Sequence, residues 1–517
     1  MNGWPYITFL TIVPLIGGVI IAGLEAGQKS LARRLAFGLS LLALALVLLM
    51  WKGFQPALAG LQFEERHGWI PSLGVEYHVG VDGIGLLMLL LTAIVVPMAM
   101  LASWKIQERV PLFFALMLFL QAGLFGTFTA MNFFHWFIFW ELSLIPAFFL
   151  IRLWGGSMRA PAATQFFVYT MAGSVALLLT FLAIFVATHK FDFVELAAMG
   201  RNGTLAAELA DKLGWKDLTA KCLALVIFSG ALLGLAVKVP MMPFHTWLPV
   251  AYAEAPTGVT MLLTGLMSKM GVYGFLRILV PLFPGELRSV LVPLLFLAVV
   301  TIVFSAGAAF AQRDLKRVLA YSSINHLGYC LLGIFAVMRS SAVLPFPALE
   351  KASALNGVML QMFNHGLTAA TLFWFVGMLE ERAGSRGLDD FGGLRKVAPV
   401  FCGLMGIAMF ASLGLPGLNG FIGEFLIFKG AYPLATWATA LSITGLLVTA
   451  VFILTVLQRV FHGPLNPRWL TMPDLTLRER VMVLPAVGLM FVIGIYPQVV
   501  LGMLNGTVVG LVQHLRF

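Results

Sequence analysis

The sequence predicts an all-helical protein that crosses a membrane many times. Of its 517 residues, 60% are hydrophobic and only 11% are charged, whereas soluble proteins carry about 25% charged residues. Apolar runs of about 20 residues, each long enough to cross a bilayer, recur from one end of the chain to the other. A membrane β-barrel would show short alternating segments instead. The expected fold is therefore an all-α polytopic membrane bundle.

About 14 spanning segments are expected from the apolar runs. The longest polar intervals between them are 53–82, 189–220 and 459–479, and none is large enough for a soluble domain. The expected spans are 4–24, 35–52, 83–103, 111–131, 132–151, 162–188, 221–239, 256–283, 287–310, 317–338, 353–379, 397–428, 432–458 and 480–513.

Positive charges are distributed unevenly between alternate loops. The loops after the first, third and every further odd-numbered span hold 18 Lys and Arg residues, whereas the remaining loops and the termini hold 11 besides Lys429. Because cytoplasmic loops are enriched in Lys and Arg, the first set is expected on the cytoplasmic side. Both termini are then expected on the outer, periplasmic side of a bacterial inner membrane. The net charge of +10 reflects this bias and does not indicate nucleic-acid binding.

Two spans contain helix breakers at related positions. One break is Lys238-Val239-Pro240, and the other is the stretch from Leu413 to Gly420 around Pro416, so the two prolines are 176 residues apart. A second repeated motif, Val-Pro-Leu, occurs at 110–112 and 292–294, a spacing of 182 residues. Both spacings equal five helices with their loops, and an odd number of spans inverts a repeat in the membrane. Paired breaks in inverted repeats indicate a transport site.

This pattern divides the chain into four parts. Residues 1–110 form the first three helices, and residues 111–284 form a first five-helix repeat, helices 4–8. Residues 285–461 form an inverted second repeat, helices 9–13, and residues 462–517 contain helix 14.

Four ionisable residues lie inside apolar segments: Glu141, Lys238, Lys269 and Glu424. A charge at the centre of a bilayer helix costs roughly 2.5–3.5 kcal/mol by insertion measurements. Burial favours the neutral form of such groups, whereas pairing favours the charged form. Two acids and two bases at this depth, with Lys238 and Glu424 beside the breaks, therefore predict a proton relay more strongly than structural ion pairs.

Histidines extend this set in the second half of the chain. His326 and His365 lie in apolar segments between Lys269 and Glu424 in chain order, and histidine commonly relays protons near neutral pH. His135 and His245 remain ambiguous. The sequence has no nucleotide-binding, metal-binding or haem motif, and its three cysteines lack metal-ligand spacing. No cofactor is expected in this chain, so energy for transport must come from partner subunits or an ion gradient.

Specific motifs resemble a known family, the antiporter-like membrane subunits of respiratory complex I, the proton-pumping NADH:quinone oxidoreductase, and within it the M-type branch. The motifs are Trp140-Glu141-Leu142, Trp154-Gly155-Gly156, the stretch from Lys238 to Pro249, Glu254-Ala255-Pro256-Thr257, the stretch from Gln312 to Arg317, Tyr321-Ser322-Ser323, Pro416-Gly417 and the stretch from Asn419 to Phe425.

The resemblance implies 14 helices with inverted repeats at helices 4–8 and 9–13, and a central axis of charged residues. It implies that Glu141 and Lys238 are partners, that Lys269, His326 and His365 belong to the axis, and that Glu424 is its acidic end. Partners would be other antiporter-like subunits and a peripheral redox arm that carries the flavin and iron–sulfur clusters.

Four positions depart from the family pattern. Val250 and Tyr252 stand where the family usually has Asp and His, Gln165 replaces a usual Lys, and Asn132 replaces a frequent acid. These positions are expected near the membrane faces, outside the central axis, where protons are taken up or neighbouring subunits dock.

The expected function is proton translocation within an NADH:quinone oxidoreductase of the complex I type. It competes with three further hypotheses: a subunit of a multi-subunit sodium/proton antiporter, a related hydrogenase-linked or carbon-uptake-linked complex, and a scaffold that transports nothing. A scaffold gains nothing from the cost of buried charges. The antiporter and the hydrogenase-linked or carbon-uptake-linked complexes differ from complex I mainly in their partners.

Overall fold

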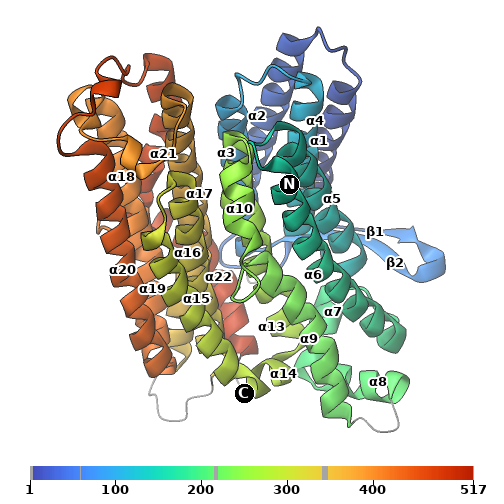
Figure 1. Cartoon of the computed structure of the whole chain (residues 1–517). Coiled ribbons are helices and arrows are strands. Elements are labelled where there is room, and N and C mark those ends of the chain that lie inside the picture. The colour runs from blue at the N-terminus through green and yellow to red at the C-terminus, as the bar shows by residue number, and fades with distance from the viewer. Residues whose placement is uncertain (1–3, 59, 215–218, 340–346, 516–517) are drawn as a thin grey trace.

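The computed structural model describes residues 4–58, 60–214, 219–339 and 347–515. Its helices run roughly alongside one another in a bundle, from which one β-hairpin projects sideways (Figure 1). Two of the charges counted for orientation, Lys216 and Arg516, lie outside the described residues. The helical fold predicted from the apolar runs is confirmed.

The first half of the chain contains most of the short elements. Its elements are α1 (Tyr6–Ala22), α2 (Lys29–Gly53), β1 (Gln62–Ile70), β2 (Val75–Val81), α3 (Gly83–Ala102), α4 (Val110–Thr129), α5 (Phe133–Trp154), α6 (Arg159–Thr188), α7 (Phe193–Arg201), α8 (Thr204–Leu213), α9 (Ala220–Lys238), α10 (Trp247–Glu254), α11 (Thr257–Leu262), α12 (Ser268–Gly274), α13 (Val280–Leu282) and α14 (Pro284–Ser289).

The second half is built from longer helices. They are α15 (Leu291–Ala311), α16 (Leu315–Val337), α17 (Pro347–Ala383), α18 (Pro399–Leu413), α19 (Asn419–Leu434), α20 (Thr436–Phe461), α21 (Leu477–Ile495) and α22 (Gln498–His514).

Among the described residues, eleven helices are long and apolar enough to cross a membrane, and the bent pair α21 and α22 gives a twelfth candidate. The shorter apolar helices α1 and α18, the latter continued by α19, account for the remaining predicted spans. The helices and the predicted spans thus agree in order and position along the chain.

Both predicted breaks are present. Helix α9 ends at Lys238 and α10 begins at Trp247, while α18 ends at Leu413 and α19 begins at Asn419. The second break starts at Gly414, whose φ of 79° is a left-handed conformation that costs glycine little. Each break thus lies directly beside a predicted relay residue or within a few residues of one.

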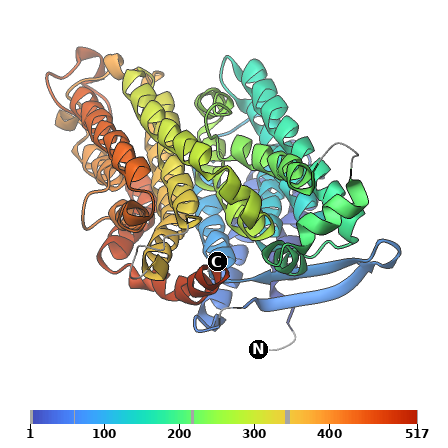
Figure 2. The ribbon, with the colours of Figure 1, turned by 90° about the horizontal axis from the view of Figure 1, so that it is seen from below.

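The C-terminal segment 480–513 is not the single predicted span. It consists of α21 and α22, which meet at a bend of 64°. The bend falls at Tyr496 and Pro497, where proline cannot continue the backbone hydrogen bonding and disfavours a helical conformation in the preceding residue. Helix α22 consequently lies across one end of the bundle (Figure 2), and α21 qualifies as a candidate span only together with α22.

The helix between Thr257 and Leu282 is continuous, but its hydrogen bonding is not that of an α-helix throughout. It contains two π-helical segments, Leu263–Met267 and Phe275–Leu279, between α11, α12 and α13. A π segment shifts the hydrogen-bond register and leaves carbonyl groups available to other donors. The most apolar stretch of this helix is fully buried, as is that of α17, so the carbonyls freed within it face protein.

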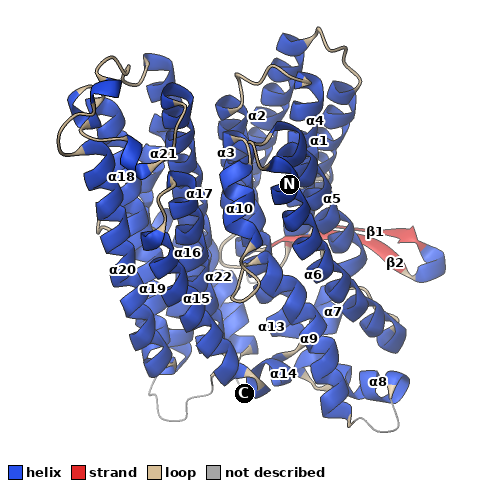
Figure 3. Cartoon of the chain, viewed as in Figure 1, coloured by secondary structure: helices blue, strands red, loops and turns tan. Residues whose placement is uncertain are grey.

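The β-hairpin was not predicted. Strand β1 pairs antiparallel with β2, and Glu65 lies opposite Val79; these are the strands in Figure 3. The signal was present within the polar interval 53–82, because Val75, Tyr77, Val79 and Val81 alternate with other residues at the period of a strand. We call the end of the bundle that carries this hairpin the hairpin face, and the opposite end the loop face.

His78 fastens the hairpin to the bundle. Its Nδ1 hydrogen-bonds with Asp192, which caps α7, and its Nε2 lies 2.9 Å from Glu64 Oε1. Burial acts to lower the pKa of His78, but the hydrogen bonds and charges of Asp192 and Glu64 outweigh it, and the pKa is raised. Burial acts to raise the pKa of Asp192, but its hydrogen bonds with His78 and backbone amides lower it.

We predict that docking of the hairpin depends on pH. With a raised pKa, His78 contributes fully below about pH 6.5, and its contribution is lost as the pH rises through the raised value. Asp192 has a lowered pKa, so it stabilises the docked hairpin fully above about pH 3.9. This stabilisation is lost only as the pH falls through the lowered pKa. Hydrogen exchange of peptides within 62–81, corrected for intrinsic rates, should be slowest between the lowered pKa of Asp192 and the raised pKa of His78. It should become faster at alkaline pH, above the pKa of His78.

The matched control uses a second histidine of the hairpin. His67 is exposed on β1, so His67→Gln should keep the pH profile, whereas His78→Gln should flatten it. The charged neighbours Arg66 and Glu195 stay unchanged in both variants. Equal profiles in the two variants would contradict the assignment to His78.

Candidate functional site

Lys269 lies at the centre of a buried polar cluster. It is fully buried, and its Nζ donates to the carbonyl of Thr264 at 2.5 Å. The same Nζ lies 2.7 Å from His365 Nδ1 on α17. The Thr264 carbonyl belongs to the first π-helical segment, so the irregular backbone supplies the acceptor that holds this lysine.

His326 and Glu424 continue the cluster. His326 Nδ1, on α16, lies 3.1 Å from Glu424 Oε1 on α19. Gln361 Nε2 lies 3.4 Å from both of these atoms, and Ser412 Oγ lies 3.3 Å from His326 Nε2. The rings of His326 and His365 are 5.0 Å apart between centroids, which brings the two histidines into one group.

The order of the two histidines in space is opposite to their order in the sequence. Chain order placed His326 next to Lys269 and His365 nearer Glu424, but the structure runs Lys269, His365, His326, Glu424. The reason is that α17 packs directly against the π-helical segment before Lys269. His365, on α17, therefore faces the lysine, while His326 on α16 faces α19.

A small cavity accompanies this series. It has a volume of about 10 Å³ and is lined by both histidines, Gln361, Asn364, Glu424 and their neighbours. Gln361 Oε1 and Asn364 Oδ1 are buried without a protein partner. A polar cavity of roughly 10–15 Å³ with such partners can hold one water molecule. The space between His326 and His365 is thus suited to a water that relays protons.

Glu141 and Lys238 interact through their charges and not through a direct contact. Lys238 is buried at the end of α9, and its Nζ lies 4.8 Å from the centroid of the Trp140 ring. Glu141 is half-buried, its Oε1 has no hydrogen-bond partner, and no ion pair joins it to Lys238 within the described residues. The carboxylate of Glu141 nevertheless lies near enough to act electrostatically on Lys238.

Lys238 also stands apart from Lys269. The two helices are in close contact, because a Cβ on Gly271 of α12 would lie 3.0 Å from Val239 N and 3.2 Å from Lys238 Cβ. Within the described residues, however, no hydrogen bond or ion pair links the two lysines. The six predicted residues therefore form a connected group of four and a second pair, Glu141 and Lys238, whose members interact through their charges.

Sequence reasoning missed Tyr252. Its hydroxyl donates to the carbonyl of Leu263 at 3.0 Å. The side chain of this departure is therefore buried against the helix that carries Lys269. Asn132, by contrast, caps α5 by accepting from His135 N at 2.7 Å and donates to Glu76 of the hairpin, so it lies at the hairpin face as expected.

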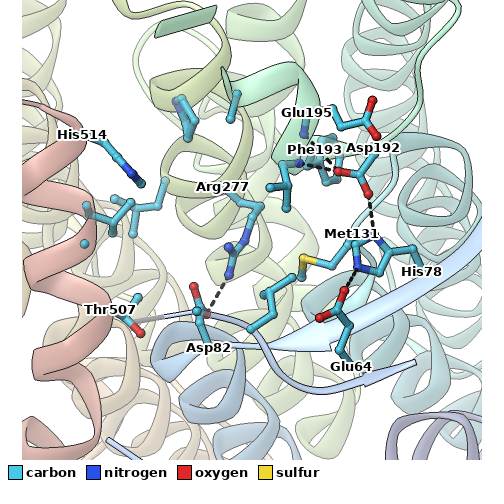
Figure 4. A pocket seen from close by; sticks show the side chains of 18 of the residues that line it. Glu64, His78, Asp82, Met131, Asp192, Phe193, Glu195, Arg277, Thr507 and His514 are labelled. Carbon is cyan, nitrogen blue, oxygen red and sulfur yellow. Dashed lines mark hydrogen bonds and ion pairs between the residues drawn. The ribbon is translucent and has the colours of Figure 1, made fainter. Parts of the chain in front are cut away.

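A second, larger cavity opens at the hairpin face (Figure 4). Its volume is about 430 Å³, and Asp82, Arg277, His78 and Thr507 are among its lining residues. Arg277 Nη2 lies 2.7 Å from Asp82 Oδ1, and Arg277 Nε donates to the Tyr273 hydroxyl at 3.2 Å. This buried ion pair and Tyr273 lie between the cavity and the turn of helix that carries Lys269.

Comparisons with known proteins agree on one family. A family model described as NADH:quinone oxidoreductase/Mrp antiporter, TM, matches residues 130–452. Subunit M of the NADH-quinone oxidoreductase of Rhodobacter capsulatus is 34% identical, over 98% of this chain and 96% of its own length. Subunit M of the F(420)H(2) dehydrogenase of Methanosarcina mazei is 35% identical, over 97% and 96% respectively. A chain of respiratory complex I from Thermus thermophilus with bound NADH matches with a TM-score of 0.83 and 28% identity, over 99% of this chain and 100% of that one.

We predict that Gly414→Ala disturbs the Glu424 end of the site. A Cβ there would lie 2.6 Å from Glu424 Oε2, and the φ of Gly414 is 79°. A left-handed conformation costs a residue with a Cβ about 1–2 kcal/mol. The purified protein in detergent should therefore unfold at a lower temperature. Gly403→Ala, on the same helix α18 with open space at its Cβ, should not, and an equal loss in both variants would contradict the argument.

Proposed function

The chain belongs to the family of antiporter-like membrane subunits described as NADH:quinone oxidoreductase/Mrp antiporter, and from this premise we propose that it is an M-type proton-translocating subunit of a complex I-type enzyme. It is an integral membrane component of an oxidoreductase complex and carries out no redox chemistry itself. Its partners are other antiporter-like subunits and a peripheral redox arm. Flavin and iron–sulfur clusters belong to subunits of that arm.

We infer the orientation from charge and from the position of the chain ends. Ile7 N donates to Glu65 Oε1 at 2.8 Å, and Lys351 Nζ donates to Leu515 O at 3.3 Å, so the two ends of the described chain meet segments of the hairpin face. The loops that are rich in Lys and Arg connect helices at the loop face. The positive-inside rule then supports a cytoplasmic loop face, with both termini on the outer side.

We also propose the repeat boundaries 111–284 and 285–461, flanked by 1–110 and 462–517. The support is that each proposed repeat has one broken helix, α9 with α10 in the first and α18 with α19 in the second. A buried ionisable residue accompanies each break, Lys238 in the first and Glu424 in the second. Such paired interruptions are typical of transport sites formed by inverted repeats.

The single observation that carries the proposal is the buried series Lys269, His365, His326 and Glu424. Successive members are joined by a 2.7 Å contact, a pair of rings 5.0 Å apart and a 3.1 Å contact. A proton on Lys269 can pass to His365 Nδ1, cross to His326 by way of a water in the small cavity, and reach the Glu424 carboxylate. Each group can hold the proton, so the transfer needs no partner outside the chain.

We propose that Glu141 and Lys238 control this series. The charge on Lys238 is held by the Trp140 ring and by the negative end of the helix dipole, because Lys238 is the last residue of α9. A shift that brings the half-buried carboxylate of Glu141 closer stabilises this charge, and a shift away from it favours release of a proton. A movement in a neighbouring subunit can thus be converted into proton transfer.

A sodium/proton antiporter subunit is the second candidate, because the matching family model covers both classes of protein. The partners of the chain separate the two functions. We predict that a tag on this chain recovers flavin- and iron–sulfur-containing subunits from native membranes. Mass spectrometry and the visible spectrum of the purified assembly measure this. Recovery of small membrane subunits alone, in an assembly that exchanges sodium for protons, would contradict the complex I assignment.

We predict that Glu141→Gln removes the proposed control of the Lys238 charge by Glu141. The amide keeps the size of the side chain but removes the charge that acts on Lys238. Proton translocation per electron pair in membrane vesicles should lose most of this subunit's share, because a positioned proton-transfer group contributes about 10²–10⁴-fold to the rate of its step. Glu25→Gln, at an exposed turn of the loop face, is the matched control. Normal translocation together with normal electron transfer in Glu141→Gln would rule out this role.

A further inference from the structure

One face of α17 is polar where this helix packs against its neighbours. Helices α16, α17 and α19 are in mutual contact. Residues three or four apart lie on the same face of a helix, and four buried residues of α17 follow this spacing: Gln361, Asn364, His365 and Thr368. We call these four residues the polar stripe of α17.

A reciprocal pair of asparagines fastens the start of α19 to the polar stripe. Asn364 Nδ2 donates to the carbonyl of Asn419 at 2.5 Å, and Asn419 Nδ2 donates to the carbonyl of Asn364 at 3.3 Å. Asn419 Nδ2 also lies 3.2 Å from Thr368 Oγ1, and both asparagines are fully buried. Because Asn419 is the first residue of α19, these bonds fix where the helix that carries Glu424 begins.

Gln361 lies against α19 one turn earlier in α17. A Cβ on Gly423 would lie 2.6 Å from Gln361 Oε1 and 3.1 Å from the backbone N and the Cα of Gln361. A residue without a side chain at position 423 therefore lets the two helices approach closely. Since Gly423 directly precedes Glu424, this packing brings the amide of Gln361 to the carboxylate.

The amide nitrogen of Gln361 reaches both members of the pair that ends the buried series. Gln361 Nε2 lies 3.4 Å from His326 Nδ1 and 3.4 Å from Glu424 Oε1, and these two atoms are 3.1 Å apart. The other end of the amide, Gln361 Oε1, is buried without a partner among the described residues, and Gln361 lines the small cavity. The amide therefore links the pair to the cavity that is suited to a water.

The chemistry of the pair gives this amide a task. When His326 Nδ1 carries a proton, it donates directly to Glu424. Once that proton has left the pair, a ring nitrogen with a free lone pair faces a carboxylate oxygen, and two buried acceptors without a donor between them are unfavourable. An amide nitrogen carries two hydrogens and accepts none, so Gln361 Nε2 can offer one hydrogen to each acceptor.

We propose that Gln361 is a positioning residue for the last transfer of the series: its amide holds His326 Nδ1 and Glu424 Oε1 within transfer distance after a proton has left them. The role rests on the proposed function, because it concerns a step of the same series. In that step the N–H bond of His326 Nδ1 breaks and an O–H bond forms on Glu424. Gln361 itself neither gains nor loses a proton.

The other groups around the pair do not supply this donor. The ring of His365 lies 5.0 Å from that of His326, and Tyr329 meets the His326 ring edge-on at 5.4 Å, both between centroids. Ser412 Oγ lies at the other ring nitrogen of His326, at 3.3 Å from Nε2. Within the part of the chain that the structure describes, Gln361 is the one donor within hydrogen-bonding distance of both atoms of the pair.

Two variants of Gln361 and one matched control test the role of the amide. Gln361→Met keeps a long side chain but removes both donor hydrogens, whereas Gln361→Asn keeps the amide and withdraws it from the pair. Gln121 on α4 is also fully buried, and neither its Oε1 nor its Nε2 has a partner within the described residues. Gln121→Met therefore removes a buried amide from a spanning helix without touching the series.

The first measurement is proton translocation by the assembled enzyme in liposomes, in water and in deuterium oxide. In Gln361→Met the transfer from His326 to Glu424 should slow by roughly ten- to a hundredfold, as expected when a charged group loses one hydrogen bond. The solvent isotope effect on translocation should then rise, because this transfer becomes limiting. Gln361→Asn should show a smaller rise, and Gln121→Met should match the unaltered enzyme.

Infrared spectroscopy of the same assembly reports on the contact itself. The carbonyl band of protonated Glu424, identified by its absence in Glu424→Gln, should move to higher frequency in Gln361→Met, because the oxygen loses a hydrogen-bond donor. A glutamine that only fills space would leave this band in place. Thermal unfolding of each purified variant separates a loss of stability from a loss of transfer.

An unchanged isotope effect together with an unchanged band in Gln361→Met would overturn the role of Gln361, and so would equal changes in Gln361→Met and Gln121→Met. If translocation is still lost in Lys269→Ala, the proposed relay stands without Gln361. Full translocation in Lys269→Ala would overturn the relay itself. Should Gln361→Met fail to assemble, the isotope effect and the band in Gln361→Asn decide in the same way.

Discussion

The fold depends on the requirement that backbone N–H and C=O groups within a membrane find partners inside the protein. An uninterrupted helix satisfies this requirement with its own backbone hydrogen bonds, which is why nearly all of the bundle is regular helix. Two of the interruptions occur where protein surrounds the backbone: the gap directly after Lys238 and the π-helical segment Leu263–Met267. The turn that begins at Gly414 is exposed from Leu415 to Gly417. Carbonyl groups freed at the two buried interruptions become acceptors for side chains, so the irregular backbone and the ionisable residues are found together.

Lys269 shows how this arrangement serves chemistry. A buried ammonium needs acceptors, and the π segment supplies one, the carbonyl of Thr264, while the remaining direction is taken by His365. From there the series continues through His326 to Glu424 without an apolar interruption. Toward Lys238 the polar contacts stop, although α9 and α12 are packed closely at Gly271. The coupling that we propose between the two parts therefore acts through the electric field or through water, and not through a direct contact.

Cavities at the two ends of the bundle differ in their linings. At the hairpin face, the pair Asp82–Arg277 and Tyr273 separate one cavity from the turn that carries Lys269. At the loop face, carboxylates and bases together line an opening. Because arginine stays charged at any relevant pH, the arrangement at the hairpin face opposes passage of a proton toward Lys269.

The sequence by itself determined the class of fold, the order of the spanning helices, both breaks and the identity of the buried charges. These follow from hydropathy, proline and the cost of charge in lipid, which are local properties. It did not determine the bend before Pro497, the hairpin at 62–81 or the position of Tyr252. Chain order also suggests the wrong spatial order for His326 and His365, and it does not reveal that the Trp140 ring lies beside Lys238. Only the tertiary structure decided these points, because the direction of a side chain and the helix that lies between two others depend on how helices pack, which chain order does not record.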